Sequence, residues 1–137
     1  MKRSGQAAFE YLVIVVVVMA FIIPIWAYAS GFQQDAQSQL EASYAQNAVR
    51  QIADAASLVY SQGPPARMDI QIFIPEGLQS ILFINRTVIF RQAVGSSTND
   101  IYEVSMAPLN GSLPLYQGTY WVTVKAMEGY VQVGLKE

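Results

Sequence analysis

Residues 11–29 decide the fold, and they read Tyr11-Leu12-Val13-Ile14-Val15-Val16-Val17-Val18-Met19-Ala20-Phe21-Ile22-Ile23-Pro24-Ile25-Trp26-Ala27-Tyr28-Ala29. No residue in this run is charged, and the nearest charges on either side are Glu10 and Asp35. A run of about 18 or more apolar residues is long enough to cross a membrane. In lipid, only a helix satisfies the backbone of a lone segment. The sequence therefore predicts a transmembrane helix over residues 11–29.

The residues within and before this run predict its shape and orientation. Pro24 removes one backbone hydrogen bond and clashes with the preceding turn, so we expect it to kink the helix. Lys2 and Arg3 precede the run, and basic residues beside a membrane helix tend to remain in the cytoplasm. The N-terminus is therefore expected inside the cell, and the chain from Ser30 onward outside it.

The helix is expected to continue beyond the membrane. From residue 32 to residue 62 the sequence is rich in Gln, Ala and Ser, and it contains no Gly or Pro until Gly63-Pro64-Pro65. Larger or apolar residues recur every three or four positions, as on one face of an α-helix; they are Leu40, Tyr44, Ala48, Ile52, Ala55 and Val59. We predict one helix over residues 6–61, apolar all round in its first half and amphipathic in its second.

The remainder of the chain, residues 66–137, is predicted to form a β head. Its apolar residues alternate with a period of two, which is typical of strands. Strands are expected over residues 70–74, 81–84, 87–90, 101–106, 119–127 and 130–135, with a tight turn at Asn85-Arg86 and a loop over residues 107–118. The predicted fold class is α+β, with a small antiparallel sheet whose core is completed by the amphipathic helix face.

The composition excludes several classes of function. Hydrophobic residues make up 53% of the chain and charged residues 13%, and there is no Cys and no His. These absences remove thiolate sites, most zinc sites and histidine acid–base chemistry. A net charge of −2 provides no basic surplus for nucleic acid. Asp69, Glu76, Asp100 and Glu103 are expected to be solvated charges, so we expect neither an enzyme nor a cofactor-binding or metal-binding protein.

The residues around the start of the apolar run carry a family resemblance. Ser4-Gly5-Gln6-Ala7-Ala8-Phe9-Glu10-Tyr11-Leu12 resembles the class III signal peptide of archaeal type IV pilin-like proteins. In that family a basic leader ends in a small residue before Gln, and Glu-Tyr-Leu follows. The resemblance implies a leader over residues 1–5, removed between Gly5 and Gln6 by a membrane-embedded prepilin peptidase. It also implies a type IV pilin-like fold: a long helix followed by a β head.

The resemblance further implies a structural function. The processed subunit would wait among membrane lipids until an assembly ATPase and a membrane platform protein extract it into a cell-surface filament. The filament would be a helical homo-oligomer, the apolar helices would form its core, and adhesion or surface attachment would be its function.

Glu10 is the residue for which the sequence predicts an assembly role. An acidic group at the edge of an apolar run normally has a partner. Cleavage before Gln6 creates an α-amine four residues from Glu10, so Glu10 of one subunit could pair with Gln6 of its neighbour. The alternative is that Glu10 lies in the lipid headgroup layer.

Other functions remain open from the sequence. Ala27-Tyr28-Ala29 fits cleavage of an ordinary secretory signal after Ala29, which would release a β-domain protein. A single-pass membrane-anchored surface protein, a minor pilin and an archaellum component are further alternatives.

Two sequons suggest N-glycosylation, at Asn85-Arg86-Thr87 and Asn110-Gly111-Ser112. Both lie in predicted turns outside the membrane, where glycans on Asn85 and Asn110 would be tolerated. Asn and Gly also favour turns on their own account, so both interpretations stay open.

Overall fold

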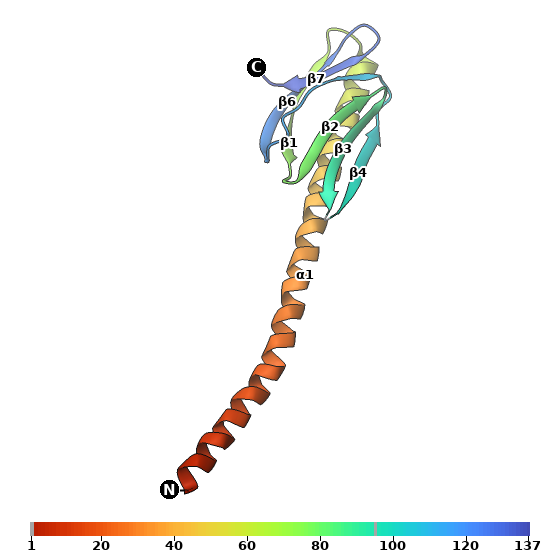
Figure 1. Cartoon of the computed structure of the whole chain (residues 1–137). Helices are drawn as coiled ribbons and strands as arrows, with labels where there is room; N and C mark the ends of the chain where they lie inside the picture. The colour runs from red at the N-terminus through yellow and green to blue at the C-terminus, as the bar shows by residue number, and fades with distance from the viewer. Residues whose placement is uncertain (1, 95) are drawn as a thin grey trace. The chain divides into compact units, whose positions relative to one another are not determined.

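The computed structural model describes residues 2–94 and 96–137; residue 1 of the predicted leader lies outside the described residues. The chain divides into two compact units, residues 1–37 and 38–137. Helix α1 (Lys2–Gln62) begins in the first unit and ends in the second, and the strands of the described residues all belong to the second. The layout is α+β, as predicted, with a long N-terminal helix before the β strands (Figure 1).

In the first unit, α1 is an unbroken helix with a long exposed stretch. It runs through Pro24 without interruption, although proline has no N–H to donate to the helix. All residues from Gly5 to Ala29 are exposed. This unit therefore presents its apolar side chains on every side of the helix.

The C-terminal end of α1 lies in the second unit and follows from local sequence. Gly63 has φ 73°, a left-handed conformation that glycine adopts without strain. Its N–H donates to the carbonyls of Val59 and Tyr60 at 3.2 and 3.1 Å, which satisfies the last turn of the helix. Pro64 and Pro65 follow, and proline cannot continue a helix.

The strands of the second unit form two sheets. One contains, in spatial order, β1 (Arg67–Ile74), β6 (Gly118–Ala126), β7 (Val131–Leu135) and β5 (Leu109–Gly111). The other contains β2 (Leu78–Ile84), β3 (Thr87–Val94) and β4 (Ser97–Val104). The predicted hairpin around Asn85 is confirmed as the β2–β3 turn, where Asn85 has φ 53°.

The sheet arrangement corrects the prediction of one antiparallel sheet. The described residues form two sheets, and β5 pairs with β7 in parallel, within residues that were expected to form a loop. β5 has only three residues, which is too short to show an alternation of apolar and polar side chains. It is a strand because it pairs with β7. A Cβ at Gly111 would clash with the carbonyl oxygen of Val133, so only glycine permits the close approach. β4 also starts before the expected residue 101, because residues 97–100 pair with β3.

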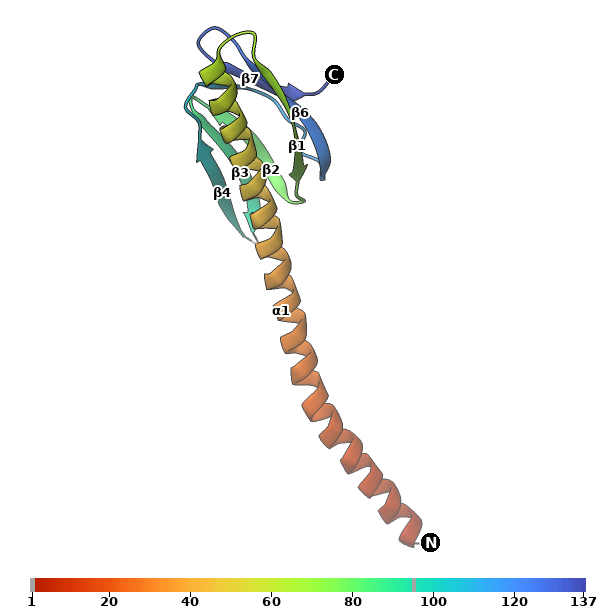
Figure 2. The same cartoon turned by 180° about the vertical axis from the view of Figure 1, so that it is seen from behind.

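The core lies between the two sheets and the helix segment of the second unit. Seven helix residues belong to one buried cluster with residues of both sheets; they are Ala45, Ala48, Val49, Ile52, Ala55, Ala56 and Val59. In Figure 2 this segment lies in front of the β2–β3–β4 sheet. The predicted role of the amphipathic face in completing the core is thus confirmed.

Two residues assigned to that helix face are exposed instead, and their assignment was wrong. Leu40 is 58% exposed and Tyr44 47%. A step of four residues turns about 40° beyond a full helical revolution, so a stripe that repeats every four residues moves around the helix. Leu40 therefore lies about 120° from Ile52. Tyr44 lies between them, and its ring meets Phe73 edge-on with centroids 5.1 Å apart.

Candidate functional site

The first candidate site is the apolar surface of α1 in the N-terminal unit. Its large side chains are well exposed, for example Phe21 at 68%, Trp26 at 71% and Tyr28 at 79%. Among the described residues, α1 is the one helix long and apolar enough to cross a membrane, judged by length and composition. Leaving such side chains in water costs roughly 1.5–3 kcal/mol each relative to burial. This surface therefore needs a cover of lipid or protein.

The structure brings Gln6 and Glu10 together at the start of this surface. They lie one helical turn apart, and the Gln6 Nε2 donates a hydrogen bond to the Glu10 Oε1 at 3.3 Å within the same chain. Both residues are exposed, so the Glu10 carboxylate is accessible to other donors. Gly5 lies next to them, and nothing approaches within 4 Å of the position a Cβ would occupy there. The predicted cleavage bond is thus on an open part of the helix.

The two sequons lie close together in the head. Asn85 is exposed in the β2–β3 turn, as expected. Asn110 is also exposed, but it lies in β5 and not in a turn, because β5 pairs with β7. The Asn85 carbonyl accepts a hydrogen bond from the Leu109 N–H at 2.6 Å, which places the first sequon beside the second. This proximity was not apparent from the sequence, where the sequons are far apart.

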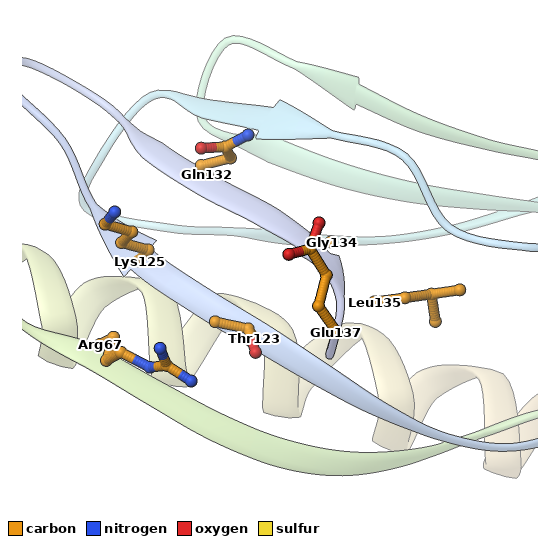
Figure 3. Close-up of a pocket in the computed structure, with 7 residues that line it drawn as sticks. All are labelled: Arg67, Thr123, Lys125, Gln132, Gly134, Leu135 and Glu137. Atoms are coloured by element: carbon orange, nitrogen blue, oxygen red, sulfur yellow. The ribbon is translucent and has the colours of Figure 1, made fainter.

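A hollow of about 580 Å³ lies on the outer face of the β1–β6–β7 part of the first sheet. Figure 3 shows its lining: Arg67, Thr123, Lys125, Gln132, Gly134, Leu135 and Glu137. Gly134 is the register partner of Thr123, and its missing side chain lowers the floor of the hollow. The hollow is partly open to solvent, and all of its lining residues except Glu137 lie in strands.

Asp69 is the charged centre beside this hollow. Its Oδ1 accepts a hydrogen bond from the Thr123 hydroxyl at 2.7 Å, and its Oδ2 lies 2.9 Å from the Lys136 ammonium. The Thr123 hydrogen bond, followed by that of Lys136, lowers the pKa of Asp69 below its ordinary value of 3.8. Arg67 lies farther away, at 3.6 Å. These contacts link β1 to β6 and to the C-terminal residues. Asp69 therefore has a structural role, which is to connect these segments.

A second ion pair lies on the other sheet. Arg91 binds Asp100 with two hydrogen bonds, from Nε at 2.7 Å and from Nη2 at 2.8 Å. The Arg91 bond lowers the pKa of Asp100, and the same bond raises that of Arg91. Within residues 2–94 and 96–137, no group of three or more His, Cys, Asp or Glu side chains is placed to hold a metal ion.

Comparisons with known proteins give no relative: no protein family, no characterised protein and no solved structure matches this chain. What the structure establishes is an α+β protein whose N-terminal helix is long and apolar enough to cross a membrane.

Proposed function

We propose that the chain is the precursor of a structural subunit of an archaeal type IV pilus-like filament. The observation that carries the proposal is one helix with two different surfaces. Residues 5–29 are exposed on every side, whereas residues 45–59 of the same helix supply part of the head's core. The motif from Ser4 to Leu12 precedes the exposed part and resembles a class III signal peptide.

The two surfaces suit a subunit that changes its surroundings. In the membrane, lipid covers the apolar side chains of residues 11–29. When an assembly ATPase and a platform protein extract the subunit, the same side chains would be exposed to water. The free-energy cost of this exposure is roughly 2 kcal/mol for each large side chain. Only a closed bundle of neighbouring helices removes that cost, so the helices become the filament core. The folded heads lie outside and make the contacts for adhesion or attachment.

In this proposal, Glu10 fixes the axial position of neighbouring helices relative to each other by pairing with the adjacent subunit. Cleavage removes residues 1–5 and leaves an α-amine on Gln6. The internal hydrogen bond from the Gln6 side chain to Glu10 is a weak partner at 3.3 Å and is exposed. The α-amine of an adjacent subunit carries a full charge and forms a stronger, charge-assisted bond in an apolar setting. Pairing between subunits therefore removes the cost of burying Glu10.

The test is incorporation of a variant into filaments of the native chain. Glu10→Ala and Glu10→Gln are expected to be cleaved and inserted in the membrane normally but to be missing from sheared filaments. Asp35→Ala is the matched control, because Asp35 is the next acidic residue along α1 and is also exposed; it is expected to enter filaments normally. Normal incorporation of Glu10→Ala would show that Glu10 has no pairing role, and the headgroup interpretation would replace it.

A second candidate is a protein secreted after cleavage behind Ala29, or held by the uncleaved helix as a single-pass anchor. The observation that favours release is that residues 38–137 form a compact unit with its own core. The mature N-terminal residue, measured by mass spectrometry on the native protein, separates the possibilities. Gln6 at the N-terminus supports the filament subunit, and Ser30 supports secretion and overturns the pilin proposal. An uncleaved N-terminus supports the anchor.

A further inference from the structure

The outer face of the first sheet carries two cations directly opposite each other. Arg67 of β1 and Lys125 of β6 are register partners, and both side chains are exposed on this face. Like charges in directly opposite positions destabilise a pair of strands. The register partner of Lys125 on its other side is Gln132 of β7, which is also exposed. These three side chains, from three adjacent strands, form the basic row.

The carboxylates near the basic row leave both cations with free donors. Asp69 lies 3.6 Å from Arg67, which is longer than a hydrogen bond. Both oxygens of Asp69 have closer partners, the Thr123 hydroxyl at 2.7 Å and the Lys136 ammonium at 2.9 Å. In the described part of the chain, no carboxylate forms an ion pair with Lys125. The basic row therefore keeps most of its positive charge available to a ligand.

The three residues of the basic row line the hollow of about 580 Å³, as Figure 3 shows. At Gly134, nothing lies within 4 Å of the position that a Cβ would occupy, so the floor of the hollow is empty there. Sites for small molecules usually measure about 300–1,000 Å³, whereas a water molecule takes only about 30 Å³. The hollow therefore has room for a polar molecule larger than a simple ion.

The chemical groups around the hollow suit an acidic sugar. A guanidinium binds a carboxylate through two parallel hydrogen bonds, and an ammonium adds a charge-assisted one. The Gln132 side-chain amide can both donate to and accept from sugar hydroxyls. Trp121, on the same face of β6, is 52% exposed and offers an apolar ring surface beside these polar groups. A sugar ring presents the matching surfaces, because its hydroxyls lie at the rim and its C–H groups lie on the faces.

Glu137 is the lining residue that carries a negative charge. It is exposed, and in the described part of the chain it forms an ion pair with neither cation of the basic row. Its position shows that the hollow has space for a carboxylate. Its charge also repels an anionic ligand, so removing that charge is expected to strengthen binding.

We propose that the hollow binds a carboxylated sugar, a uronic-acid unit of a polysaccharide. The sugar carboxylate binds Arg67 and Lys125, and sugar hydroxyls bind the Gln132 amide. All lining residues belong to the head, and the site is complete in one chain. The inference therefore goes beyond the proposed filament and does not depend on it, because it is tested on the unassembled protein.

Titration with an alginate oligosaccharide tests the site, because alginate carries a carboxylate on every sugar. Full-length protein in a non-ionic detergent is titrated in a calorimeter at physiological salt, which screens diffuse attraction between exposed charges. Alginate is expected to bind. Dextran of the same length, which is uncharged, is expected not to bind. Poly-L-glutamate, which carries carboxylates without sugar rings, is expected to bind at least about tenfold more weakly than alginate.

Substitutions in the hollow locate the binding. Arg67→Gln and Lys125→Gln are each expected to weaken alginate binding about tenfold, because each removes a hydrogen bond between charged groups. Gly134→Val is expected to abolish it, since valine suits a strand and its side chain fills the empty floor. Glu137→Gln is expected to strengthen binding severalfold. Arg86→Gln is the matched control, because Arg86 is exposed in the β2–β3 turn of the other sheet, and it is expected to bind as the native chain does.

Three results would overturn the proposal. Failure of the native chain to bind alginate would exclude a uronic-acid ligand. Equal affinity for poly-L-glutamate would show that the site recognises charge and not sugar. Binding that Gly134→Val and both cation substitutions leave unchanged would place it outside the hollow. Circular dichroism checks the folding of each variant, and the gain expected from Glu137→Gln cannot arise from unfolding.

Discussion

Replacing Ile52 by Ala is expected to destabilise the head far more than replacing Leu40 by Ala, although both lie on the helix face that the sequence predicts to be buried. Ile52 is fully buried, whereas Leu40 is 58% exposed. Ile52→Ala removes three buried carbons, which at about 0.8 kcal/mol each amounts to about 2.4 kcal/mol of transfer free energy. The cavity left among the core residues adds to this, within an observed range of roughly 2–5 kcal/mol. Leu40→Ala is expected to stay within about 0.5 kcal/mol of the native stability.

Urea unfolding of a fragment that starts at residue 32 measures the difference, with circular dichroism of the β structure as the signal. A domain of this size loses about 1–3 kcal/mol of stability per molar urea, so a loss of about 3 kcal/mol lowers the midpoint by roughly 1–3 M. The Leu40→Ala midpoint is expected to move by no more than about 0.5 M. Equal midpoints for the two variants would refute the inference that residues 45–59 of α1 belong to the core of the head.

Three further predictions follow from other parts of the molecule. The fragment that starts at residue 32 is expected to be soluble, folded and β-rich by circular dichroism, because the apolar surface of residues 11–29 is gone; an unfolded fragment would show that the head needs the first half of the helix. Gly5→Trp is expected to leave uncleaved precursor in the membrane without disturbing the helix, since nothing lies within 4 Å of the Cβ position. Normal processing of this variant on an immunoblot would show that cleavage occurs at another bond. Because hydrogen bonds from Thr123 and Lys136 lower the pKa of Asp69 in the folded head, its stabilising contribution is complete above the ordinary pKa of 3.8 and is lost as the pH falls through the lower folded-state value. The urea midpoint of Asp69→Asn is therefore expected to depend less on pH below about pH 4 than that of the native chain, and identical pH profiles would contradict this.

Much of the candidate site at the N-terminus could be predicted because it depends on spacing along one helix. Residues four apart on a helix are neighbours, so Gln6 and Glu10 were expected to lie together, and they form a hydrogen bond. Which chain supplies the final partner of Glu10 cannot follow from spacing, because an intersubunit contact depends on the assembly. The sequons behave differently. Asn85 follows local turn chemistry, whereas Asn110 belongs to β5, which exists only through its pairing with β7.

The β2–β3–β4 sheet shows a signal that was present in the sequence but could not be interpreted there. The continuous apolar run over residues 81–84 indicates a strand that is covered on both faces. The sequence does not say which face meets the core, because that depends on where the helix and the second sheet lie. The structure places Val88, Phe90 and Ile101 inside. It thereby assigns Ile84, Tyr102 and their neighbours to the surface.

The sequence by itself determined the features that depend on neighbouring residues: an apolar helix through residues 11–29, its end before Gly63, and the turn at Asn85 between two strands. Local backbone preferences and hydrophobic periods are sufficient for these features. Only the tertiary structure decided that there are two sheets, that β5 lies parallel to β7, and that Ile52 is buried while Leu40 is exposed. The reason is that pairing partners and buried faces are set by contacts between residues far apart in the chain. A repeat of three or four residues specifies a helix face only approximately, and the packing partner selects the residues that are buried.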